Sequence, residues 1–94
     1  MSATIDELTI DYTEDGVQTV KELDKAVLTK GAWTTIVYRY KDFDKRSGEF
    51  GVDKYSIRRY QKVNGEYKLK SKFNISNKEQ AQQIIDVLTK WVKE

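Results

Sequence analysis

The dipeptide Asn64-Gly65 constrains the fold of this chain more than any other feature of its sequence. Both residues tolerate the positive φ angles of a type I′ turn, which joins two antiparallel strands through a two-residue loop. The flanking segments, residues 54–63 and 67–75, contain the β-branched and aromatic side chains that strands favour. Together these features predict a β-hairpin in the second half of the chain.

Three further segments have the character of strands. Residues 33–41 are almost entirely β-branched or aromatic, which makes them the strongest strand in the sequence. Residues 4–12 alternate weakly between apolar and polar side chains, and Asp15-Gly16 then predicts a turn before a second strand. Residues 20–29 are interpreted as a strand, because they contain several β-branched residues and end at a glycine-containing turn. A short helix that groups Leu23, Val27 and Leu28 is the alternative.

The chain ends with the pattern of an amphipathic helix. Ser76 and Glu79 have the spacing of a capping box, and apolar residues then recur at helical spacing from Ala81 to Val92. This pattern predicts a helix over residues 77–93. A series of strands followed by one helix predicts an α+β fold, in which a twisted antiparallel sheet of four or more strands has the helix packed on one face.

The length indicates one small domain, and its charged residues are unevenly distributed along the chain. The 94 residues suffice for a single core, and we divide them into an acidic N-terminal hairpin at residues 1–20, a sheet at 21–76 and a helix at 77–93. Residues 1–24 contain seven acidic side chains and one lysine, whereas residues 54–72 contain seven basic side chains and one acidic side chain. The second segment is therefore the part of the chain best suited to attract phosphate.

Composition excludes several classes of chemistry. The chain contains no Cys and no His, which removes disulfides, thiolate zinc sites and catalysis by either side chain. Residues 42–53 are interpreted as a long exposed loop, because Gly48 and Gly51 lie among charged residues. The acidic side chains of this loop lack the spacing of a calcium loop. We therefore expect no enzyme, no cofactor and no metal site. Since no apolar run is long enough to span a membrane and residues 1–10 lack the basic residues of a signal peptide, the sequence favours a cytoplasmic protein.

The alternation in residues 67–75 indicates which side chains face away from the helix. Its apolar residues share one parity and its three lysines share the other. On residues 33–41 we expect Ile36, Tyr38 and Tyr40 to point inward. On residues 54–63 we expect Ile57 to point inward and Tyr60 to point outward. The outward set combines basic and aromatic side chains: Trp33, Arg39, Lys41, Arg58, Tyr60, Lys62, Lys68, Lys70 and Lys72. Cations that follow phosphates and rings that stack on unpaired bases are typical of proteins that bind single-stranded nucleic acid.

Short motifs resemble the positive cofactor four family of transcriptional coactivators and, more broadly, the Whirly-type single-stranded-DNA-binding proteins. Residues 54–60 (KYSIRRY) are similar to a lysine-containing strand of bacterial members, and residues 30–33 (KGAW) are similar to their turn with a following Trp. Residues 73–76 lead into a helix as the last strand of the family does. The resemblance implies that a curved sheet binds unpaired DNA through Lys54, Arg58, Tyr60 and Lys62, with Lys68, Lys70 and Lys72 on the following strand.

The expected partners are single-stranded DNA or RNA and a second copy of the chain, with no membrane. The family implies a homodimer through its helices, and the apolar stripe of the predicted helix is wider than one sheet contact needs because Val87 extends it. The alternative to a homodimer is that the N-terminal hairpin folds back and covers the stripe. A transcription or DNA-maintenance factor is the function that this reading favours. The alternative is a small protein–protein interaction module without nucleic-acid binding, in which the lysines only keep a sheet face soluble.

Overall fold

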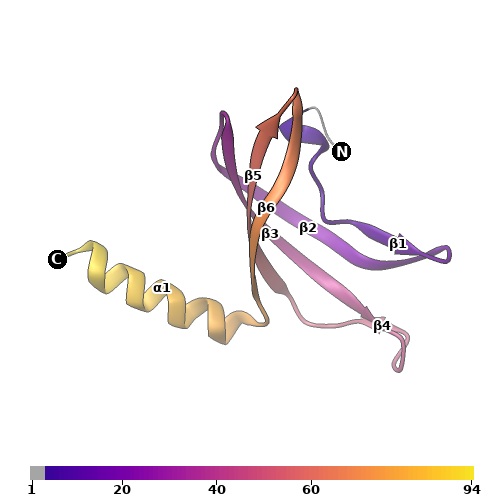
Figure 1. Ribbon diagram of the computed structural model, residues 1–94. Helices are drawn as coiled ribbons and strands as arrows, with labels where there is room; N and C mark the ends of the chain where they lie inside the picture. The colour runs from indigo at the N-terminus through magenta and orange to yellow at the C-terminus, as the bar shows by residue number, and fades with distance from the viewer. Residues whose placement is uncertain (1–3) are drawn as a thin grey trace.

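The computed structural model describes residues 4–94, which form a curled antiparallel sheet followed by one helix (Figure 1). The strands follow the order β1-β2-β3-β5-β6, and β4 pairs with the end of β3. The elements are a 3-10 turn (Ile5–Glu7), β1 (Tyr12–Glu14), β2 (Val17–Thr29), β3 (Trp33–Asp44), β4 (Glu49–Phe50), β5 (Lys54–Val63), β6 (Glu66–Ile75) and α1 (Lys78–Val92). The predicted α+β class, with an antiparallel sheet of four or more strands and a C-terminal helix, is confirmed.

Both predicted hairpin turns are present. Asn64 and Gly65 have φ angles of 52° and 80°, as a type I′ turn between β5 and β6 requires. Asp15 and Gly16 have φ angles of 51° and 79° and connect β1 to β2 in the same way. The register of two long strands therefore follows from local turn chemistry.

The sheet extends into a segment that the sequence did not mark as strand. Residues 42–53 were expected to form a long exposed loop, but β3 continues to Asp44 and pairs with β4. The rings of Phe43 and Phe50 meet edge to face at 5.5 Å, which gives this small hairpin an apolar contact of its own. The exposed turn is shortened to the residues around Gly48, whose φ is 74°.

One face of the sheet forms the core, and we call it the core face. Ile36, Tyr38 and Tyr40 of β3 are buried on it, as their alternation predicts. The segment before β1 crosses this face and buries Leu8 and Ile10 against it. The sheet and this segment are therefore the two layers that enclose the core.

A lysine fixes the N-terminal segment to the sheet. The Lys25 ammonium group on β2 donates hydrogen bonds to the backbone carbonyls of Ile5 and Leu8, at 3.1 and 2.8 Å. Residues 4–12 were expected to be a strand, but only Tyr12–Glu14 pairs with β2 and residues 8–11 run across the sheet instead. Residues 1–3 of the expected N-terminal hairpin lie outside the described residues.

The helix does not pack across a sheet face, contrary to expectation. No residue of α1 is buried, and its contact with the sheet is mainly with β6. Figure 1 shows α1 projecting away from the strands. The physical reason is that Leu8 and Ile10 already cover the core face, so the core forms without the helix. The helix bounds agree with the prediction to within one residue at each end, although Asn77 rather than Ser76 is its N-cap.

Candidate nucleic-acid interface

The predicted binding residues lie on both faces of the sheet instead of one. Residues directly opposite each other on neighbouring strands share a face, so the strand register assigns each side chain. We call the face opposite the core the open face. The core face carries Lys54, Arg58, Tyr60, Lys62 and Lys72, whereas the open face carries Trp33, Arg39, Lys41 and Lys68.

A bulge in β6 separates the three lysines. Arg58 is opposite Lys72, but Tyr60 is opposite Leu69, so that Lys70 is the extra residue on its strand. Lys68 consequently lies on the open face and Lys72 on the core face. The expectation that all three lysines emerge together required a regular strand, and it is wrong for this reason.

Tyr60 is not available for stacking. Its side chain is only 5% exposed, and its hydroxyl shares a hydrogen bond of 3.1 Å with the Tyr38 hydroxyl. Burial, followed by this hydrogen bond, raises the pKa of Tyr38 far above its usual value. The predicted parity of β5 is wrong because Ile57 is opposite Val37 on the open face and Tyr60 belongs to the core.

Two cations face each other on the part of the core face that β5 and β6 form. The Arg58 guanidinium lies 6.0 Å from the centre of the Tyr38 ring, and its Nε donates to Ser56 Oγ at 3.2 Å. Ser56 Oγ in turn donates to Asn74 Oδ1 at 2.7 Å, so that a chain of hydrogen bonds links β5 to β6 beside Arg58. Lys72 is the direct neighbour of Arg58 across the strands and is exposed. Within residues 4–94, neither cation has a carboxylate within 4.0 Å.

Lys54 is paired with a carboxylate, whereas Lys62 keeps its charge. The Lys54 ammonium group is 2.8 Å from a carboxylate oxygen of Asp42, and this hydrogen bond raises the pKa of Lys54. The Lys62 ammonium group lies 5.5 Å from the centre of the Tyr67 ring. Arg58 and Lys72 are therefore the centre of the available positive charge, with Lys62 further along the same two strands. We call Arg58, Lys62 and Lys72 the cationic strip.

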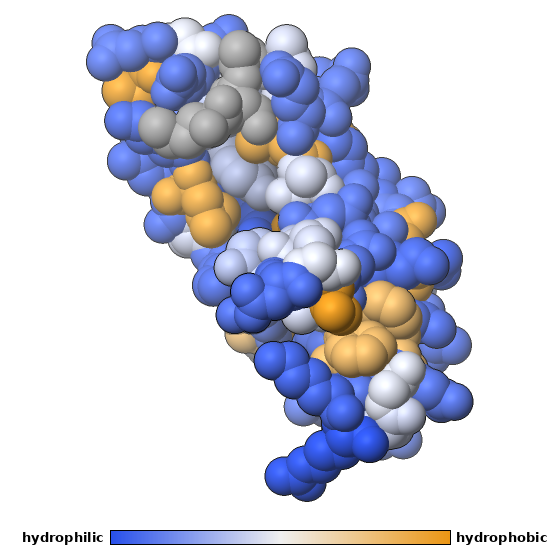
Figure 2. Space-filling model, turned by 90° about the vertical axis from the view of Figure 1, so that its right-hand side faces the viewer, coloured by the Kyte–Doolittle hydropathy of each residue, from blue (hydrophilic) through white to orange (hydrophobic). Residues whose placement is uncertain are grey.

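A groove of about 430 Å³ lies beside the cationic strip, between β1 and the centre of the sheet. Arg58 and Asn74 line one side of it, and the exposed Tyr12 ring lines the other. Asp11 and Asp42 also line it, so the groove has charges of both signs. Sequence reasoning missed Tyr12 and Asn74, because the alternation of residues 4–12 grouped Tyr12 with the core and nothing in the sequence marks the pairing of Asn74 with Ser56. Figure 2 shows the side of the molecule opposite α1, where hydrophilic side chains surround small hydrophobic patches.

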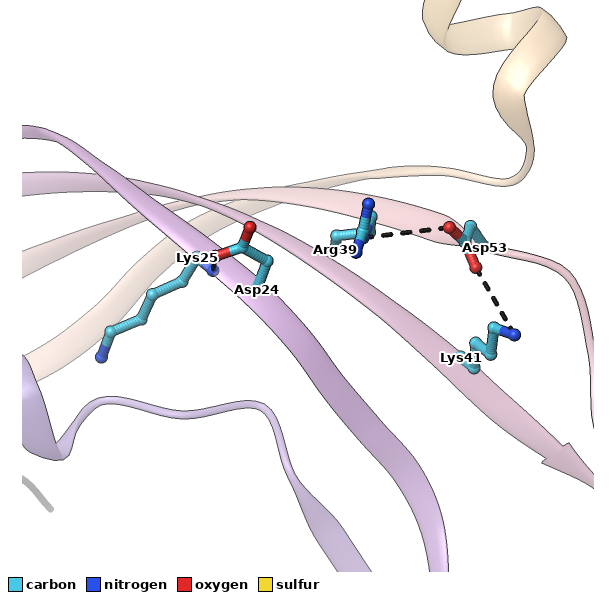
Figure 3. Close-up of polar contacts among 5 residues, drawn as sticks. All are labelled: Asp24, Lys25, Arg39, Lys41 and Asp53. Atoms are coloured by element: carbon cyan, nitrogen blue, oxygen red, sulfur yellow. Dashed lines mark hydrogen bonds and ion pairs between the residues drawn. The ribbon is translucent and has the colours of Figure 1, made fainter.

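The open face has less free charge. Arg39 and Lys41 converge on the Asp53 carboxylate, at 3.8 and 3.7 Å (Figure 3). The Arg59 guanidinium lies 4.6 Å from the centre of the Trp33 ring, which it partly covers. These contacts neutralise or occupy most of the groups that the sequence assigned to nucleic acid on this face.

No family model, curated protein or solved structure matches this chain. Across residues 4–94, no three acidic side chains lie close enough together to hold a metal ion. In the same part of the chain, no helix has the length and the apolar character needed to cross a membrane.

Proposed function

We propose that this chain is a cytoplasmic, non-enzymatic protein that binds single-stranded DNA or RNA at the cationic strip, as a transcription or DNA-maintenance factor. The observation that carries the proposal is the direct opposition of Arg58 and Lys72, neither of which has a carboxylate within 4.0 Å among residues 4–94. The resemblance of residues 54–60 to the positive cofactor four family supports the same class of ligand.

The energetics of the pair favour an anionic ligand. Like charges directly opposite each other on antiparallel strands destabilise the sheet. A phosphate between them would accept charge-assisted hydrogen bonds from both side chains and turn this repulsion into attraction. The Ser56 hydroxyl helps to orient Arg58, so part of the site is organised before the ligand binds.

Tyr12 supplies the aromatic contact that Tyr60 cannot. Its ring is exposed and lines the same groove as Arg58. A base that leaves the strip toward β1 would stack on this ring, and such stacking contributes about 1–3 kcal/mol per base. Because every base has a flat face, the binding is expected to tolerate many sequences.

The test is a titration of fluorescently labelled oligothymidine at two salt concentrations. Each phosphate contact on a single strand contributes about 0.7 to the slope of log K against log salt. We expect the Arg58→Ala/Lys72→Ala variant to bind more weakly and to lose about 1.4 units of this slope. The matched control is Arg39→Ala/Lys41→Ala, which removes two cations from the open face and should change the slope less. Equal losses in both variants, or no binding by the parent protein, would contradict the proposal.

A protein–protein interaction module is the second candidate, and one observation favours it. Ile85, Val87, Leu88, Trp91 and Val92 of α1 are exposed, and no residue of the helix is buried. Exposed apolar surface of this kind marks interaction sites. A partner for the helix is compatible with nucleic-acid binding, because α1 lies apart from the cationic strip.

A further inference from the structure

We infer that α1 of one copy packs on the open face of a second copy, and that the exchange is reciprocal. The helix offers an apolar stripe in which Trp91 is 63% exposed. Ile85, Leu88 and Val92 are exposed on the same side of the helix, at the spacing of one helical face. A helix with such a stripe needs an apolar surface to cover it.

The open face is the matching surface. Val37 of β3 and Ile57 of β5 are directly opposite each other there and are only half-buried, and Phe73 of β6 is 58% exposed beside them. One chain therefore contains both members of a helix-on-sheet layer, and both are uncovered. Two copies that exchange their helices would cover two stripes and two faces, which closes the assembly with twofold symmetry.

The connection to β6 holds the helix away from its own sheet. Only Ser76 and Asn77 separate Ile75 from the first residue of α1. The Asn77 side chain accepts a hydrogen bond from the Gln80 amide at 2.8 Å, and the Ser76 amide donates to Gln80 Oε1 at 3.0 Å. These bonds fix the direction in which α1 leaves the sheet. A short connection that cannot reverse favours the exchange of an element between copies.

One copy exposes more surface than a compact monomer of its mass, as expected if a second copy covers part of it. The accessible surface is 6864 Å², whereas a compact monomer of 11.0 kDa is expected to expose about 5,600 Å². The difference is roughly 1,200 Å², and a stable interface buries about 800 Å² on each partner. The radius of gyration, 15.1 Å against about 12 Å for a compact chain of this length, leads to the same conclusion. The area is therefore sufficient for a stable dimer.

The exchange would leave the cationic strip free. The strip lies on the core face, and α1 of the second copy would cover the face behind it. This inference does not rest on the proposed function, because it concerns different residues and is tested without nucleic acid.

The test uses light scattering and cysteine cross-linking on the full chain. The chain contains no cysteine, so Leu88→Cys and Val37→Cys variants each carry one thiol. We expect the parent protein to have twice the 11.0 kDa chain mass at micromolar concentration. After the two variants are mixed and oxidised, we expect a disulfide that joins a Leu88→Cys chain to a Val37→Cys chain.

The other outcomes would overturn the inference. A monomeric mass would show that no second copy binds, and cross-links confined to two Leu88→Cys chains would show that helices pair with each other instead. As a second variant, Leu88→Glu should give a monomer with unchanged far-UV circular dichroism, because Leu88 is 52% exposed within one chain. Gln83→Glu is the matched control, since it adds the same charge away from the stripe and should stay dimeric. A dimeric Leu88→Glu protein would also overturn the inference.

Discussion

Leu8 in the N-terminal segment offers a clear test of the core, because its truncation should lower the free energy of unfolding. Leu8 is 6% exposed and packs in the cluster that contains Tyr38. Leu8→Ala removes three carbon atoms, which at about 0.8 kcal/mol each gives roughly 2.4 kcal/mol of lost burial. The cavity that remains adds to this value, so we expect the free energy of unfolding to fall by about 3 kcal/mol. For a domain of this size the melting temperature should fall by roughly 12–24 °C.

The assay is urea unfolding followed by circular dichroism, with Leu28→Ala as the control. Leu28 lies on β2 and is 61% exposed, so the same change of side chain should cost less than about 0.5 kcal/mol there. The comparison holds residue type constant and varies only burial. Equal losses in the two variants would refute the assignment of the N-terminal segment to the core.

Three further predictions follow from buried groups and from one turn. Tyr60→Phe should lower the free energy of unfolding by about 1–3 kcal/mol in urea unfolding, because the Tyr38 hydroxyl loses its buried partner; an unchanged midpoint would contradict this. Burial raises the pKa of Tyr38 and Tyr40 above the unfolded value of about 10, so stability should be complete below that pH and fall as pH rises through it. Among the six tyrosines, Tyr38 and Tyr40 should form phenolate only together with unfolding, and complete ionisation of a folded protein would disprove the assignment. Gly65→Ala should cost about 1 kcal/mol in thermal unfolding, because its φ is 80°, whereas Gly51→Ala has no such penalty; equal effects would count against the turn assignment.

Local chemistry determined what the sequence could predict. Asn64-Gly65 sets the β5–β6 turn by its own φ preferences, and the alternation of β3 identified Ile36 and Tyr38 as core because Arg39 and Lys41 mark the other face as polar. The helix bounds were also predictable, since capping and periodicity are local.

Non-local packing explains the rest. On β5, Ile57 and Tyr60 lie on opposite faces and are both partly or fully buried, so alternation alone could not indicate which one faces the core. The bulge at Lys70 depends on the pairing of β6 with β5 and has no signature in the lysine spacing. The core face is covered by Leu8 and not by the helix. Both segments are apolar, so the sequence alone could not indicate which one would cover this face.

The most direct test of the account is a map of NMR chemical-shift changes on adding oligothymidine to the isotopically labelled protein. We expect the largest changes at Arg58, Lys72 and Asn74 on the core face and at Tyr12, which lines the same groove. The indole N–H of Trp33 on the open face should keep its shift throughout the titration. Changes centred on Trp33 with an unchanged Arg58 would contradict the central claim that the cationic strip is the binding surface.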